Sequence, residues 1–254
     1  MPFVERPESS ALFVDFDGSL APIVDDPAVA QALPAARHAL ARLVPALRSV
    51  TVVSGRPAAF LVDALAIDGL GYAGTYGLER VVDGAVVVDP RVAPWLDIVA
   101  RAADEAEAAL PDLRVERKGG VAVTVHWRSD PGRGPAAAAW AASTAARLGL
   151  AAPLRGRMAV ELRPPVPVDK GTTVAELAAG ADAAAFAGDD AGDLPAFAAL
   201  RARQRRGELL HAVSIGVRSD EGPPEIEDAD VVVDGPAGLA ALFDALADEL
   251  SARG

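Results

Sequence analysis

Acidic residues in this sequence stand at the ends of apolar runs, at spacings that suit catalysis. Asp15 lies near the end of the run ALFVDF, and Asp17 comes directly after it. Asp189, Asp190 and Asp193 follow the run AAAFAG. Oxygen ligands without histidine or cysteine suit a hard cation, most simply Mg²⁺. One carboxylate can attack phosphorus to give an aspartyl-phosphate while a second serves as acid and base. The acids therefore indicate metal-assisted phosphoryl chemistry.

Other residues could hold a phosphoryl group. Ser54 follows the β-branched run SVTVV and precedes Gly55 and Arg56. The chain has 22 arginines but only two lysines, Lys118 and Lys170, so each lysine is a candidate for a site that needs a compact ammonium group. A hydroxyl, an ammonium group and Mg²⁺ together could cradle a phosphoryl group.

The elements that must position these residues alternate between strand and helix at both ends of the chain. We expect strands at 11–16, 49–55, 71–77, 183–190, 212–217 and 230–235, a hairpin over 80–89 that turns at Asp83-Gly84, and helices at 33–47, 57–67, 170–181, 193–203 and 236–250. This alternation predicts an α/β fold with a parallel sheet covered by helices on both faces. Ligands of such sheets bind outside the carboxyl ends of the strands, where the acids, Ser54 and Lys170 can converge.

The middle of the chain follows a different pattern. A helix to about Leu110 is followed by strands at 113–118 and 121–128, a helix at 135–149, and strands at 152–157 and 158–164. Short links between neighbouring strands predict an antiparallel sheet with helices on one face. We interpret this stretch as a second, smaller domain inserted into the first.

Composition excludes several classes of protein. The net charge of −12 argues against a nucleic-acid partner, and the absence of cysteine excludes disulfides and thiolate chemistry. No apolar run approaches the ~18 residues of a membrane span, and the N-terminus lacks a signal-peptide pattern. We expect a cytoplasmic protein, a monomer, with no membrane partner. The basic cluster Arg201–Arg206 is interpreted as a solvated helix end.

Other interpretations of the acids remain. Asp15 and Asp17 before a glycine could start a calcium loop, but the third acid and the distal glutamate of that motif are missing. A receiver domain also combines acids, a hydroxyl and a lysine, but it is a single domain of roughly half this length. Buried aspartates that only cap backbone groups are the purely structural alternative.

The segments DFDGS, VVSGR, DKG and GDDAGD, in this order, resemble the four signature motifs of the haloacid dehalogenase superfamily of phosphotransferases. The longer segments DFDGSLAPIVDDP, YGLE, VERKGGVAVTVHWR and VELRPPVPVDKG resemble the trehalose-6-phosphate phosphatase family over nearly the whole chain. The resemblance implies a Rossmann-like core domain at 1–92 and 165–254, and an inserted α/β cap domain of the C2 type at 93–164. It also implies a Mg²⁺-dependent phosphatase that releases phosphate from trehalose 6-phosphate.

The same resemblance implies residue roles. Asp15 would be the nucleophile and Asp17 the general acid and base, and Ser54 and Lys170 would hold the phosphoryl group. Mg²⁺ would be bound by Asp15, the Asp17 carbonyl and Asp189, with Asp193 supporting its waters. The expected substrate contacts are Arg56, Glu79, Glu116, Lys118, Arg128 and Glu161. His126 remains open between facing the sugar and packing.

The sequence departs from the family pattern at several positions. Ser19 stands where threonine is more usual, YGLE replaces a segment that often holds histidine or alanine, and the fourth motif lacks a threonine and a glutamate. The alternatives are a phosphatase for a sucrose, mannosylglycerate or glucosylglycerol phosphate, and a regulatory domain that binds a phosphosugar without turnover.

Overall fold

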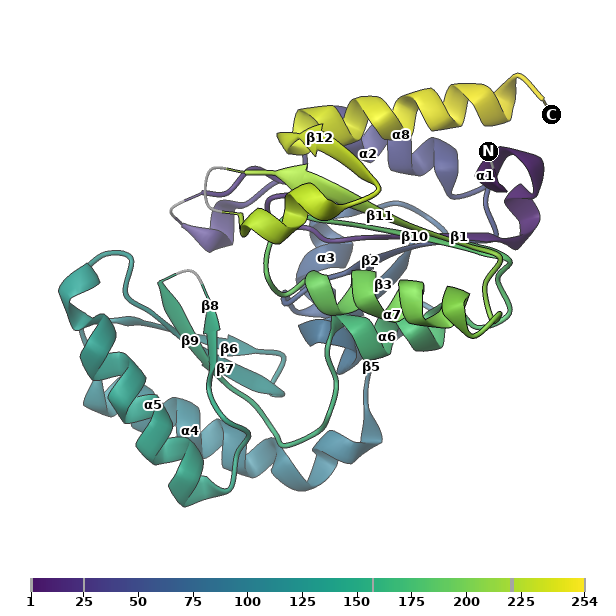
Figure 1. Cartoon of the computed structure of the whole chain (residues 1–254). Helices are drawn as coiled ribbons and strands as arrows, with labels where there is room; N and C mark the ends of the chain where they lie inside the picture. The colour runs from purple at the N-terminus through teal and green to yellow at the C-terminus, as the bar shows by residue number, and fades with distance from the viewer. Residues whose placement is uncertain (1, 25, 157, 220–221, 254) are drawn as a thin grey trace. The chain divides into compact units, whose positions relative to one another are not determined.

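The computed structural model describes residues 2–24, 26–156, 158–219 and 222–253 (Figure 1). Asp25, part of an expected motif, and Arg157, the end of an expected strand, lie outside the described residues, as do the two terminal residues. The chain forms two compact units, Met1–Ala85 with Val168–Gly254, and Val86–Pro167.

The main sheet has eight strands in the order β12-β11-β10-β1-β2-β3-β4-β5. The strands are β1 Ser10–Val14, β2 Ser49–Val53, β3 Gly71–Gly74, β4 Glu79–Val82, β5 Ala85–Val88, β10 Ala183–Gly188, β11 His211–Arg218 and β12 Val231–Asp234. Strands β12 to β3 pair in parallel and β4 runs antiparallel to β3. Asp83 and Gly84 both have positive φ, as a tight hairpin turn requires, which confirms the expected hairpin.

Strand β1 is buried throughout because helices cover both faces of the sheet (Figure 1). Its residues Leu12 and Val14 pack toward α2, α3 and α8, whereas Ala11 and Phe13 pack toward α6 and α7. The helices of this unit are α1 Pro2–Glu5, α2 Pro34–Leu43, α3 Ala58–Leu65, α6 Lys170–Leu177, α7 Leu194–Arg205 and α8 Gly235–Ser251. The expected α/β fold with a parallel sheet is confirmed.

Two helix boundaries follow from local chemistry. Helix α2 ends at Leu43, earlier than the expected residue 47, since Pro45 follows and has no N–H to donate to the Ala41 carbonyl. Helix α6 begins with a capping box, in which the Asp169 carboxylate accepts the Thr172 N–H at 2.7 Å and the Thr172 hydroxyl accepts the Asp169 N–H at 2.9 Å. The box fixes Lys170 as the first residue of the helix.

The second unit contains a four-stranded antiparallel sheet in the order β6-β7-β9-β8. Its strands are β6 Arg114–Lys118, β7 Ala122–His126, β8 Leu154–Gly156 and β9 Ala159–Leu162, and its helices are α4 Leu96–Ala109 and α5 Gly134–Leu148. Both helices cover one face of this sheet, where Val123, Val125, Val160 and Leu162 form the core (Figure 1). The expected antiparallel sheet with helices on one face is confirmed.

Short 3-10 helices connect the larger elements, at Pro7–Ser9, Pro27–Val29, Thr75–Gly77, Pro90–Trp95, Pro131–Arg133 and Pro224–Asp228. Among the described residues, no helix combines the length and the apolar character needed to cross a membrane.

Candidate active site

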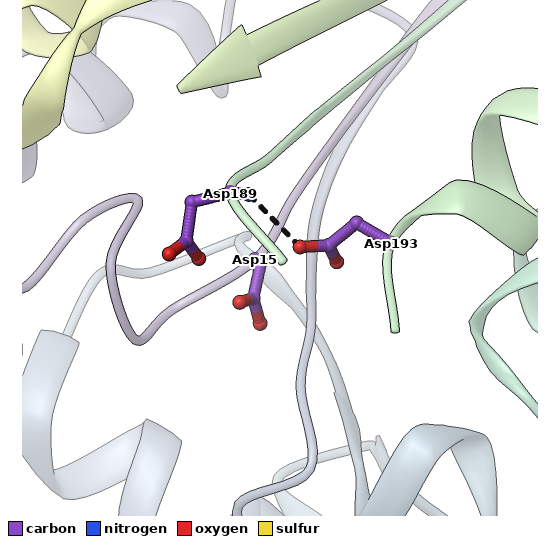
Figure 2. Close-up of side chains that lie close together, drawn as sticks. All are labelled: Asp15, Asp189 and Asp193. Carbon is purple, nitrogen blue, oxygen red and sulfur yellow. Dashed lines mark hydrogen bonds between the residues drawn. The ribbon is translucent and has the colours of Figure 1, made fainter. Parts of the chain in front are cut away.

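The ends of two neighbouring strands bring the acids together. The hydrogen bonding between β1 and β10 continues one residue past Val14, since the Asp15 N–H donates to the Ala187 carbonyl at 2.9 Å. Asp15 therefore lies beside the end of β10, from which Asp189 follows. Figure 2 shows the side chains of Asp15, Asp189 and Asp193 close together, and one oxygen of each lies within 4.8 Å of the others.

Lys170 joins this cluster from the start of α6. Its Nζ lies 2.8 Å from Asp15 Oδ1 and 2.6 Å from Asp193 Oδ1, and all three side chains are almost fully buried. Burial opposes the charge of the ammonium group, but Asp15 and Asp193 outweigh it and hold the pKa of Lys170 above its usual range. Lys170 is therefore a permanent cation at this site.

The carboxylates carry more negative charge than Lys170 neutralises. Burial raises the pKa of Asp15 well above its usual range despite the nearby ammonium group, and Asp193, Asp190 and Asp189 add to the rise. Burial likewise raises the pKa of Asp193 to about 7. A divalent cation would relieve this excess, and the all-oxygen donor set of Asp15 and Asp189 fits Mg²⁺ rather than a soft metal.

Asp193 is held by hydrogen bonds at both of its oxygens. Oδ1 accepts from Lys170, and Oδ2 accepts the backbone N–H groups of Asp189 and Asp190 at 2.9 and 3.0 Å. These bonds shape the loop that carries Asp189, and the expected role of Asp193 in supporting the waters of Mg²⁺ stays a prediction. Ser219 adds a hydrogen bond from its Oγ to Asp189 Oδ2 at 3.3 Å.

The carboxylate of Asp17 binds Arg56, whereas that of Asp15 lies beside Lys170. Strand β1 ends at Val14 and the chain turns at Gly18, whose φ is +80°, so Asp15 and Asp17 do not continue a regular strand. Both carboxylate oxygens of Asp17 bind the guanidinium group of Arg56 at 2.7 Å. Arg56 also donates to the Pro27 carbonyl at 2.7 Å. Arg56, which was expected to contact substrate, therefore binds the carboxylate of Asp17.

Two further candidates in this unit are buried. Ser54 is 1% exposed, and its Oγ accepts the Arg56 N–H at 3.2 Å, which orients the hydroxyl at the end of β2. Glu79 is 3% exposed, and its Oε2 accepts the Ala58 N–H at 2.8 Å and the Thr75 hydroxyl at 3.1 Å. These bonds let Glu79 cap the N-terminus of α3, and its expected substrate contact stays a prediction.

The candidates in the second unit gather on the sheet face opposite the helices. Lys118 Nζ lies 2.7 Å from Glu161 Oε2, which also accepts the Thr124 hydroxyl at 3.1 Å. His126 Nε2 lies 2.8 Å from Glu116 Oε2, so this histidine belongs to the polar face and not to the core. Arg128 lies two residues beyond β7 and is half-buried.

The sequence patterns did not single out the residues around Tyr76. Thr75, Tyr76 and Gly77 have φ values of 45°, 61° and 111°, and their loop is bonded to the segment after β2 and to α6. The departure from the family pattern at YGLE was the only signal in the sequence for this unusual loop conformation.

Comparison with solved structures identifies the fold. A crystal structure described as a trehalose-6-phosphate phosphatase related protein has a TM-score of 0.80, is 23% identical, and is matched over 96% of this chain and 100% of that one. A haloacid dehalogenase-like hydrolase from Bacteroides thetaiotaomicron has a TM-score of 0.60 at 16% identity, over 93% and 99% of the two chains. The chain has a haloacid dehalogenase fold.

Sequence comparison identifies the family. The trehalose-phosphate phosphatase of Mycolicibacterium paratuberculosis is 34% identical over 94% of this chain, although the match spans only 62% of that longer protein. The family model for trehalose-phosphatase matches residues 13–236, from β1 to the start of α8. The chain belongs to the trehalose-phosphatase family.

Proposed function

We propose that this chain is a Mg²⁺-dependent phosphatase that hydrolyses trehalose 6-phosphate to trehalose and phosphate. The observation that carries the proposal is the buried cluster of Asp15, Lys170, Asp189 and Asp193 at the ends of β1 and β10, in a chain of the trehalose-phosphatase family. A nucleophilic carboxylate, a fixed cation and two further acids are the parts that phosphoryl transfer through an enzyme aspartate requires.

The first step forms an aspartyl-phosphate. An oxygen of Asp15 attacks phosphorus, and the bond between phosphorus and the sugar oxygen breaks. Asp17 gives a proton to the departing sugar oxygen, so trehalose leaves as a neutral alcohol. Lys170 and the Ser54 hydroxyl bind the oxygens of the phosphoryl group during the transfer.

The second step regenerates the carboxylate. Asp17, now ionised, takes a proton from water as the water oxygen attacks phosphorus, and the bond between phosphorus and Asp15 breaks. Phosphate leaves, and Asp17 is protonated again for the next cycle. Asp15, Asp189 and the Asp17 carbonyl would hold Mg²⁺, which when bound neutralises charge on the phosphoryl group and on the carboxylates.

The second unit acts as the cap, with the expected boundaries 93–164 as part of the proposal. Support comes from its polar sheet face, where Lys118, Glu161, Glu116 and His126 are paired and half-buried or buried. Carboxylates and ammonium groups bind the many hydroxyls of a disaccharide, and a site built for them rejects sugars that lack one. We include Arg128 among these contacts.

A panel of sugar phosphates tests the proposed substrate. Phosphate release with Mg²⁺ is measured for trehalose 6-phosphate and for sucrose, mannosylglycerate and glucosylglycerol phosphates. The proposal predicts the highest kcat/KM for trehalose 6-phosphate. A higher value for another member would reassign the substrate, and binding of trehalose 6-phosphate without phosphate release would indicate a regulatory domain. A cytoplasmic monomer with no nucleic-acid or membrane partner remains the accompanying prediction.

A further inference from the structure

The loop Thr75–Gly77 has a backbone that its sequence does not favour. All three residues have positive φ, at 45°, 61° and 111°. Thr75 is β-branched and fully buried, and such a residue rarely adopts the left-handed conformation. Strain of this kind persists only where the surroundings impose it, and it concentrates at functional sites.

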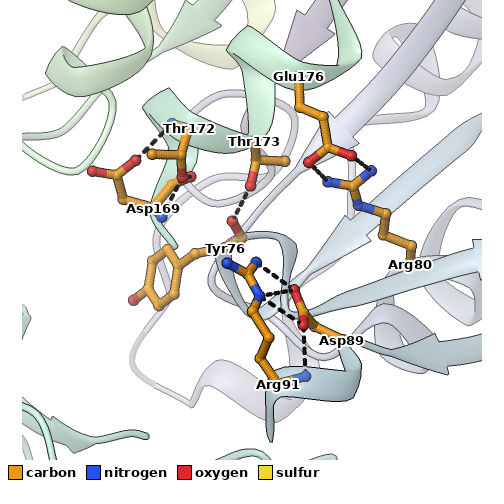
Figure 3. A network of polar contacts seen from close by, with 8 residues as sticks. All are labelled: Tyr76, Arg80, Asp89, Arg91, Asp169, Thr172, Thr173 and Glu176. Carbon is orange, nitrogen blue, oxygen red and sulfur yellow. Dashed lines mark hydrogen bonds and ion pairs between the residues drawn. The ribbon is translucent and has the colours of Figure 1, made fainter. Parts of the chain in front are cut away.

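Hydrogen bonds from two neighbouring segments impose this conformation. The N–H groups of Thr75 and Tyr76 donate to the carbonyls of Arg56 and Ser54, each at 2.8 Å. The Thr173 hydroxyl, from helix α6, donates to the Tyr76 carbonyl at 2.7 Å (Figure 3). The loop is therefore bonded to the segment that carries Ser54 and to the helix that begins with Lys170.

This conformation places the ring of Tyr76 against Gly55. A side-chain carbon on Gly55 would lie 2.9 Å from both Cζ and Oη of Tyr76, so the ring packs directly over Gly55 and would have to move for a larger residue. Figure 3 shows the ring extending away from Thr173. Tyr76 is half-buried, whereas Thr75 and Gly77 on either side of it are buried.

We propose that Tyr76 contacts the sugar next to the transferring phosphoryl group and so contributes to substrate specificity. This inference rests on the proposed function, in which Ser54 and Lys170 hold the phosphoryl group. The Tyr76 ring packs over Gly55, the residue after Ser54, and so lies next to the proposed phosphoryl site. A phenol presents an apolar face to the C–H groups of a sugar and a hydroxyl to its oxygens.

The test compares two substrates that share only the phosphoryl group. Acetyl phosphate carries no sugar, so kcat and KM are measured with it and with trehalose 6-phosphate, for Tyr76→Phe and Tyr76→Ala. Loss of one hydroxyl hydrogen bond is expected to raise KM for trehalose 6-phosphate about fivefold in Tyr76→Phe. Loss of the ring in Tyr76→Ala is expected to lower kcat/KM by about thirtyfold. Values for acetyl phosphate, and inhibition by inorganic phosphate, should change less than about twofold.

The chain offers a matched control, because Tyr72 is its only other tyrosine and bonds with its hydroxyl to the backbone of Ile67. Tyr72→Phe should leave both substrates unaffected. Equal losses with both substrates, or weaker inhibition by inorganic phosphate in Tyr76→Phe, would overturn the inference and assign Tyr76 to shaping the phosphoryl site. Failure of the unmodified chain to hydrolyse trehalose 6-phosphate would instead refute the proposed function.

Discussion

Arg56 holds both carboxylate oxygens of Asp17. Its Nε lies 2.7 Å from Oδ2 and its Nη2 lies 2.7 Å from Oδ1. The guanidinium group is itself fixed, by the Pro27 carbonyl and by the ring of Phe60, whose centroid lies 4.6 Å from Cζ. A guanidinium group that binds both oxygens of a carboxylate fixes the orientation of the carboxylate and also pairs with its charge. Arg56 therefore positions the residue proposed to move the proton.

Replacing Arg56 by lysine should lower kcat. A lysine keeps the charge but cannot hold two oxygens in one plane, and loss of a charged hydrogen bond of about 1.5–3 kcal/mol corresponds to about 10–100-fold in rate. Steady-state kinetics with trehalose 6-phosphate would measure the effect. Arg80→Lys is the matched control, because Arg80 makes a similar two-bond pair with Glu176 at 2.9 and 2.7 Å and has no proposed role (Figure 3). A rise in KM with unchanged kcat would instead favour direct substrate contact by Arg56.

Much of this fold could be predicted from the sequence, because buried strands and amphipathic helices leave strong apolar patterns. The expected strand at 71–77 illustrates the limit. It ends at Gly74, since hydrogen bonds from Thr75 to Arg56 and from Tyr76 to Ser54 hold these two residues at positive φ. Those bonds join segments about twenty residues apart, and no local preference of Thr75 or Tyr76 predicts them.

The candidate site could likewise be predicted from the sequence only in part. Asp15, Lys170 and Asp189 could be predicted to meet, because the ends of parallel strands share one edge of the sheet. The pairing of Asp17 with Arg56 depends on how the chain turns at Gly18, which spacing alone does not determine. The burial of Glu79 and its hydrogen bond to the start of α3 follow from tertiary packing, which the sequence pattern does not show.

Replacing Gly18 by alanine should disrupt the metal site. Gly18 has φ +80°, and a side-chain carbon there would lie 2.2 Å from Asp189 Oδ2. Gly84 has a similar φ of +77° but nothing within 4 Å, so Gly84→Ala isolates the cost of the backbone conformation, about 1 kcal/mol. We expect Gly18→Ala to lose Mg²⁺-dependent phosphate release and Gly84→Ala to retain it. Comparable activity in the two variants would contradict the placement of Asp189.

Removal of Mg²⁺ should destabilise the fold, more strongly at high pH. Burial raises the pKa of Asp193 to about 7 from an ordinary 3.8, so the metal-free folded chain binds a proton that the unfolded chain has released. This stabilising contribution is complete below about pH 4 and is lost as the pH rises through about 7. Mg²⁺ at 100 times its Kd adds about 2.7 kcal/mol to the free energy of unfolding at a pH where no proton competes for the site.

Thermal unfolding with Mg²⁺ and with EDTA, at pH 6 and pH 8, would measure this difference. The gain in Tm from Mg²⁺ should be larger at pH 8, and it should disappear in Asp189→Asn. Equal gains at both pH values would show that protons and Mg²⁺ do not compete at this cluster.

The buried pair of Lys118 and Glu161 should make single substitutions costly. Lys118→Met leaves Glu161 charged and buried, which costs about 3–5 kcal/mol, whereas the double variant with Glu161→Leu removes both charges and should recover most of the Tm. Neither variant should hydrolyse trehalose 6-phosphate normally, because both lose sugar contacts. Recovery of activity together with Tm in the double variant would mean that the pair is purely structural.

The central claim is that Asp15 attacks phosphorus. Phosphate release from trehalose 6-phosphate with Mg²⁺, compared between the unmodified chain and Asp15→Asn, tests it most directly. Asparagine has nearly the same shape but is a very weak nucleophile, so the variant should retain its circular dichroism spectrum and show no phosphate release above the no-enzyme control. Full phosphate release by a folded Asp15→Asn variant would contradict the account.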